Sequence, residues 1–97
     1  MQDQSRKPAQ EKQEATLPEV TFSTFIMSLA SSTLVQLGEV PNPETGKTEC
    51  NLLMAKHSID ILTMLQGKTA SCLTPEEAQL LESLIYELRL KYVMRKG

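Results

Sequence analysis

A run of 19 residues, from Val20 to Gly38, contains no charged side chain. Its length is close to the ~20 apolar residues that a helix needs to cross a bilayer. Eight of its positions are Ser, Thr or Gln, however, and no aromatic belt or basic flank marks its ends. We therefore expect a buried helix over about residues 22–37 and not a membrane span. At about 100° per residue its apolar arc comprises Phe22, Phe25, Ile26, Leu29, Ala30, Thr33, Leu34 and Leu37.

The ends of this helix carry recognisable signals. Pro18 disfavours helix for the residue before it, so the helix begins after that point. Either Thr21 or Ser23 can cap the start, because a hydroxyl accepts a hydrogen bond from the free N–H groups of the first turn. Gly38 is expected to end the helix as a left-handed C-terminal cap.

Two further helices are predicted, over residues 52–68 and 75–95. Asn51 is the expected cap of the first. Thr74, Pro75 and Glu77 start the second, with a hydroxyl cap, a proline at the first helical position and an acid at the third. The first of these helices has two adjacent apolar seams, one of Leu52, Ala55, Ile59 and Leu62 and one of Met54, Ser58, Ile61 and Leu65. The seam of the second comprises Leu81, Leu84, Ile85, Leu88 and Tyr92, widened by Leu80.

The only substantial loop covers residues 38–50. Pro41 and Pro43 prevent the helix from continuing, because their rings fix φ and remove a donor. The sequence from Asn42 to Gly46 suits a tight turn in which Gly46 takes a positive φ. Gly46-Lys47-Thr48 resembles the end of a phosphate-binding loop, but position 41 is a proline and no strand precedes it. We therefore interpret this segment as a turn.

The chain of 97 residues is long enough for one domain. Residues 1–16 contain only two alanines as apolar core candidates after Met1 and carry mixed charge, so they cannot bury enough surface to offset their ordering entropy. We predict a disordered polar tail over 1–16 and an all-α, three-helix domain over 17–97.

Composition excludes several classes of function. Ten Lys and Arg against twelve Asp and Glu leave a net charge of −2, which does not favour nucleic-acid binding. One histidine and two cysteines exclude most multi-ligand metal sites, so no metal and no cofactor is expected. Cys50 and Cys72 flank the helix over 52–68 and are predicted to be too far apart to pair. No secretory signal is visible, so we expect a cytoplasmic location with free thiols.

No residue set indicates catalysis. His57 and Asp60 are three residues apart and could meet on one helix face, where a carboxylate can orient a general base. No nucleophile is placed beside them by the sequence, and a solvated surface histidine is the alternative. The role of Cys50 and Cys72 is equally open. We expect a protein that is not an enzyme.

Apolar area is left over once three helices are packed. The domain is small, and small domains are hard to stabilise alone. We predict a homodimer that completes the bundle, against the alternative of a monomer that hides the first helix centrally. The methionines are expected to fill the core or its edges. The candidate interface comprises Phe22, Phe25, Ile26, Leu29, Ala30 and Leu34, and the candidate loop contact comprises Pro41, Asn42, Pro43, Thr45 and Gly46.

The leading functional hypothesis is a non-catalytic protein-interaction and self-association module, with an unidentified protein as a further partner. A different class is also open: a peripheral membrane or apolar-ligand-binding protein that uses the helix over 22–37. Binding to liposomes would separate these two hypotheses.

Several segments together resemble a small bacterial family, catalogued as domain of unknown function 1844, across roughly residues 17–93. The resemblance implies a short, cytosolic, helical protein behind a variable polar tail, and it implies no activity, cofactor or catalytic residue. Two positions depart from the family's pattern. The family favours a residue other than cysteine at position 50, where this chain has Cys50, and a proline at position 53, where it has Leu53. The segments that carry the resemblance are Leu17-Pro-Glu-Val-Thr-Phe-Ser-Thr-Phe-Ile, Leu34-Val-Gln-Leu-Gly, Pro41-Asn-Pro-Glu-Thr-Gly, Asn51-Leu, Ala55-Lys, Ile59-Asp-Ile-Leu, Leu73-Thr-Pro-Glu-Glu and Tyr86-Glu-Leu-Arg-Leu-Lys-Tyr-Val.

Overall fold

A computed structural model describes residues 17–97, which form three α-helices and no strand. The helices are α2 (Phe22–Gln36), α3 (Leu52–Lys68) and α4 (Pro75–Lys96). The predicted all-α, three-helix fold is confirmed, and the helix bounds differ from the expected ones by one residue at the end of α2 and of α4. The predicted tail over 1–16 lies outside the described residues.

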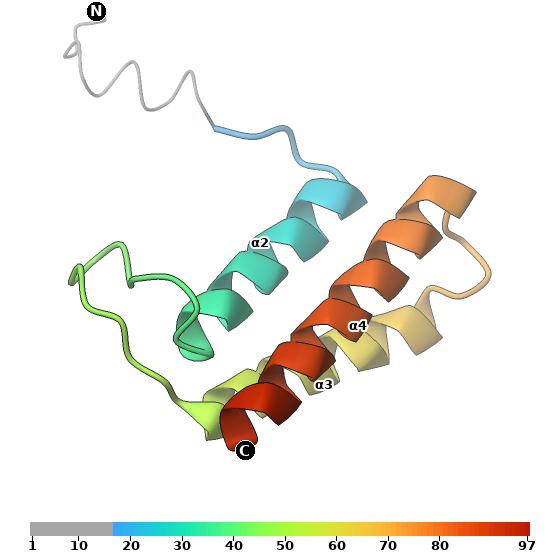
Figure 1. Ribbon diagram of the computed structural model, residues 1–97. Coiled ribbons are helices and arrows are strands. Elements are labelled where there is room, and N and C mark those ends of the chain that lie inside the picture. Colours follow the sequence, from blue (N-terminus) through green and yellow to red (C-terminus); the bar gives the residue numbers. More distant parts are fainter. Residues whose placement is uncertain (1–16) are drawn as a thin grey trace, which may run out of the picture.

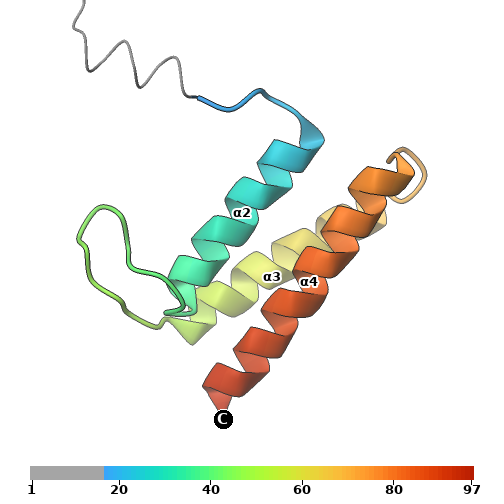
Figure 2. The ribbon, with the colours of Figure 1, turned by 45° about the horizontal axis from the view of Figure 1, so that its top comes forward.

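Each of the three helices contacts the other two. In Figure 1 and Figure 2, α2 and α4 run in the same direction and α3 runs in the opposite direction across them. The long loop therefore connects one end of α2 to the start of α3, and a short turn over residues 69–74 returns the chain into α4. Within the described residues, none of these helices combines the length and the apolar character that a bilayer span requires.

Side-chain caps start all three helices where the sequence predicted them. Thr21 caps α2: its hydroxyl accepts from the Thr24 N–H at 3.1 Å, and the Thr24 hydroxyl accepts in return from the Thr21 N–H at 3.0 Å. This reciprocal box decides between the two expected caps of α2, because it satisfies two free donors at once. Asn51 caps α3, and Thr74 with Glu77 forms a second reciprocal box on α4.

The core lies between the facing sides of the helices. It takes one face from each helix, at the three- and four-residue spacing that places side chains over one another. The buried apolar residues are Ile26, Ala30, Leu37, Ala55, Ile59, Leu62, Leu81, Ile85 and Leu88. One polar side chain is buried with them: Thr33, whose hydroxyl donates to the Leu29 carbonyl at 2.8 Å and so brings no unpaired donor into the core.

The end of α2 is a Schellman turn around Gly38. The Glu39 N–H donates to the Leu34 carbonyl and the Gly38 N–H donates to the Val35 carbonyl, each at 3.0 Å, while Gly38 adopts a φ of +78°. Arg95 from the end of α4 then joins this turn, because its guanidinium donates to the Gly38 carbonyl and to the Glu39 carboxylate, both at 3.1 Å. A cation is thereby held at the negative end of α2.

Two side-chain hydrogen bonds tie α3 to its neighbours. Ser58 donates to the Gln36 side-chain carbonyl at 2.7 Å, and the Gln36 backbone carbonyl accepts from the Asn51 N–H at 2.7 Å. Gln36 thus holds both the start and the second turn of α3 against the end of α2. On the other side, Arg89 of α4 donates to the Thr63 hydroxyl at 2.9 Å.

Replacing Gly38 by alanine is expected to destabilise the fold by about 1–2 kcal/mol, the penalty of an L-residue in the left-handed region. A Cβ there would also lie 3.3 Å from the Cβ of Cys50. Gly67→Ala is the matched control, since Gly67 is helical with open space around the Cβ position, and it should stabilise by about 0.5–1 kcal/mol. Urea unfolding followed by circular dichroism measures both; equal effects would contradict the role given to Gly38.

Candidate functional site

Most of the predicted interface on α2 lies in the core of the chain itself. Ile26 and Ala30 are buried, and Phe22, Leu29 and Leu34 are partly buried against the same core. Of the six residues, Phe25 alone is classed as exposed, with 49% of its surface accessible. The apolar arc of α2 is therefore largely consumed by contacts to α3 and α4, and a second copy could reach only its margins.

The outer side of α2 is small and uncharged. Ser28, Ser31 and Ser32 are exposed there, between Phe25 on one edge and Met27 on the other. Short side chains let another backbone approach closely, but they offer little apolar area to bury.

The loop over 38–50 has a defined conformation that depends on Asn42. The Asn42 side chain accepts from the Glu44 N–H at 2.8 Å, and its backbone carbonyl accepts from the Gly46 N–H at 2.7 Å. Its own N–H donates to the Lys47 carbonyl at 2.8 Å, which closes the turn. Gly46 has a φ of +73°, so the predicted positive φ is confirmed. Pro41, Pro43, Thr45 and Gly46 are exposed, while Asn42 is half-buried beneath them.

An open hollow lies between this loop and α2; Asn42 and Pro43 of the predicted loop contact line it, but no residue of the predicted α2 interface does. Its volume is about 400 Å³. A smaller neighbour of about 190 Å³ shares Val35, Gln36 and Asn42 with it, so the two form one depression that continues toward the start of α3. Its polar lining consists of amides and hydroxyls together with the carboxylates of Glu44 and Glu49. These groups can form hydrogen bonds with a partner, but most of the exposed lining is apolar.

A second exposed surface was not predicted from the sequence. The outer stripe of α4 comprises Tyr86, Leu90, Val93 and Met94, whose accessible fractions are 70%, 49%, 63% and 71%. Spacings of four and three residues place these side chains on one face of the helix, opposite the buried seam. The same spacing is visible in the sequence. It was not recognised there because the longer apolar seam through Leu81, Ile85 and Leu88 lies on the same helix.

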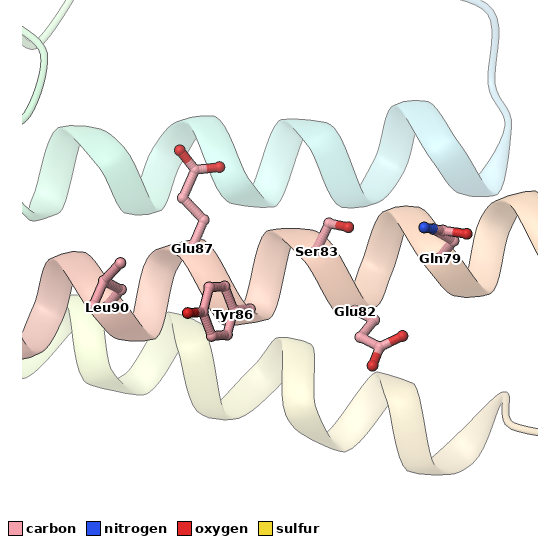
Figure 3. Close-up of a pocket in the computed structure, with 6 residues that line it drawn as sticks. All are labelled: Gln79, Glu82, Ser83, Tyr86, Glu87 and Leu90. Carbon is pink, nitrogen blue, oxygen red and sulfur yellow. The ribbon is translucent and has the colours of Figure 1, made fainter.

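An open hollow of about 550 Å³ lies along the same face. Figure 3 shows that its six lining side chains all project from α4, with Tyr86 and Leu90 at one end and Gln79 at the other. Ser83 lies between them and is small, so the surface is depressed at that point.

The methionines do not fill the core. Met27, Met54, Met64 and Met94 are all exposed, and the expectation that they fill the core or its edges is wrong. They lie on the outward faces of their helices, because the inward positions are occupied by Ile, Leu and Ala. Flexible, polarisable side chains on a surface adapt well to a binding partner.

The remaining chemical candidates are separate from one another. His57 is exposed, and Asp60 pairs with Lys56 at 3.0 Å and not with the histidine. Cys50 and Cys72 are both free and exposed. Within residues 17–97, no three His, Cys, Asp or Glu side chains are grouped as a metal site would require.

Fold and surfaces together define a small three-helix domain with exposed apolar side chains on its outer faces. The family model described as "Domain of unknown function (DUF1844)" matches residues 19–94, and the chain belongs to this family. No curated protein and no solved structure shows significant similarity to the chain.

Asn42→Ala should loosen the loop without unfolding the domain. The substitution removes the acceptor of the Glu44 N–H, so amide exchange at Glu44 should accelerate, while the free energy of unfolding falls by less than about 1.5 kcal/mol. Thr45→Ala is the control, because it removes only the acceptor of the Lys47 N–H at 3.2 Å. Hydrogen exchange by NMR measures both variants, and unchanged protection at Glu44 in Asn42→Ala would contradict this role.

Proposed function

We propose that this chain is a non-catalytic protein-interaction module that associates with a second copy of itself. The outer stripe of α4 carries the proposal. Four large apolar side chains are exposed to solvent there, and none of them belongs to the core. Contiguous apolar surface on a small protein marks an interaction site, because burying it is worth about 25 cal/mol per Å².

Exposed apolar residues on the other helices support the same function. Leu53, Met54 and Met64 on α3, and Phe25 and Met27 on α2, are exposed as well. A domain of this size has little stability to spare, so covering such surface stabilises it through mass action. An additional protein partner can use the hollow between the loop and α2, while the stripe serves self-association.

The arrangement of polar groups supports a role other than catalysis. Within residues 17–97, no hydroxyl or thiol is hydrogen-bonded to His57, and the hollow beside α2 contains neither histidine nor cysteine. Catalysis by nucleophilic attack needs a nucleophile and a base in contact. We also place the chain in the cytoplasm, where two free, exposed thiols would remain reduced.

Binding to membranes or apolar ligands through residues 22–37 is the competing function. That function would require the apolar arc of α2 to be available. Ile26 and Ala30 are buried, so α2 would have to leave the bundle before it could insert into lipid. The packing therefore favours the interaction module.

Sedimentation of the full chain tests the proposal. Between about 1 and 100 µM, the concentration range in which weak specific dimers with micromolar affinity form, the mass should rise from 10.8 kDa toward twice that value. Flotation with vesicles of phosphatidylcholine and phosphatidylglycerol is the companion measurement, and the protein should stay at the bottom. A monomer throughout, or recovery with the vesicles, would contradict the proposed function.

A further inference from the structure

We infer that the outer stripe of α4 is the contact between two copies, and that the two α4 helices pair antiparallel about a two-fold axis level with residue 88. This inference rests on the proposed self-association and names the surface that performs it. It moves the contact from the predicted arc of α2 to the outside of α4.

The spacing of the stripe is that of a helix–helix seam. Continued toward the start of α4 it passes through Gln79 and Ser83, so the positions 79, 83, 86, 90 and 93 alternate in steps of four and three. An average of 3.5 residues is the repeat that keeps one helix face against a partner helix along its length. With the axis level with residue 88, residues 80–96 of the two helices overlap, which gives about 25 Å of such contact at 1.5 Å per residue.

The shape of the face suits a second copy. With the axis level with residue 88, Tyr86 of one copy meets Leu90 of the other, and Val93 meets Ser83. The depression over Ser83 in Figure 3 then receives an exposed valine, and each such contact is made twice. An isologous interface requires this self-complementarity, because the same surface supplies both sides.

Charge determines the direction of pairing. Before residue 88 the charged side chains of α4 are acidic, and after it they are basic: Glu76, Glu77, Glu82 and Glu87, then Arg89, Lys91, Arg95 and Lys96. Antiparallel helices bring Glu82 of one copy toward the basic end of the other, whereas parallel helices would align like charges. The helix dipoles favour the same direction.

One charge pair beside the seam carries this complementarity. Glu82 and Lys96 lie two heptads apart on the same flank, so Glu82 of each copy lies next to Lys96 of the other. Within residues 17–97, neither side chain is held in an ion pair of its own chain. Next to the axis, Glu87 and Arg89 of one copy approach the same residues of the other. Contacts within each copy reduce this repulsion, because Arg89 donates to Thr63 and Glu87 lies 3.9 Å from Lys91.

Charge reversal in the full chain tests the direction. Glu82→Lys and Lys96→Glu should each weaken the dimer, and a mixture of the two variants should recover it, since opposite charges then face each other again. Two exposed pairs at 0.2–1 kcal/mol each correspond to a loss of roughly two- to thirtyfold in the dimerisation constant at low salt. The double variant should match the wild-type chain, and circular dichroism confirms that all variants are folded.

Cross-linking tests the register. In a chain with Cys50→Ser and Cys72→Ser, the double substitution Ser83→Cys with Val93→Cys should form an intermolecular disulfide. The two positions are about 15 Å apart along one helix, which is too far to bridge within a copy. Ser83→Cys alone should not cross-link, because its counterpart lies at the opposite end of the contact.

The outcomes separate this inference from the proposed function. A wild-type chain that stays monomeric overturns both. A dimer that ignores the charge reversals and forms no disulfide from Ser83→Cys with Val93→Cys keeps self-association but overturns the α4 contact. Cross-linking by Ser83→Cys alone overturns the proposed register, because position 83 of the two copies then meets, as it would in parallel helices or with an axis level with residue 83.

Discussion

Burial of one face of α2 against α3 and α4 is the interaction on which the rest of this structure depends. The helix has no charged side chain, so its burial requires no desolvation of ions. Ile26 and Leu37 are fully buried, and each aliphatic side chain of this kind contributes about 1.5–3 kcal/mol. Thr33, the one buried polar group, satisfies its hydroxyl within its own helix. Without this face, α3 and α4 would form a helix pair with one side of their core open.

The same burial determines which surfaces remain for binding. Because the apolar arc of α2 is occupied, its outer side is left with serines, and the exposed apolar area lies mainly on α3 and α4. The outer stripe of α4, which begins at Tyr86, is then an exposed apolar surface that a partner could bury. Because α4 carries apolar side chains on two opposite faces, one face can pack in the core while the other is available for an interface.

Polar ties hold these surfaces in a fixed relation. Gln36 connects the end of α2 to the start of α3, and Arg95 connects the end of α4 to the turn at Gly38. These contacts converge at one end of the bundle, where the loop organised by Asn42 begins. Loops that carry function are commonly presented by a rigid scaffold in this way. Membership of the DUF1844 family covers the helices and the loop together, over residues 19–94.

The sequence by itself determined the helices, the caps of α3 and α4 and the turn at Gly38, because these depend on residues within four positions of one another, such as the amide at Asn51 and a glycine without a Cβ. For α2 it left Thr21 and Ser23 as alternatives, and the structure shows Thr21 as the cap. Spacing also gave the apolar seams, but it left two adjacent seams on α3, and the structure buries the one that contains Ala55, Ile59 and Leu62. Only the tertiary structure decided which apolar face of each helix packs against which neighbouring helix, because three amphipathic helices can pack together in more than one arrangement. For that reason the contact predicted on α2 could not be distinguished from core, and the outer stripe of α4 became recognisable only once the other side of the helix was seen to be buried.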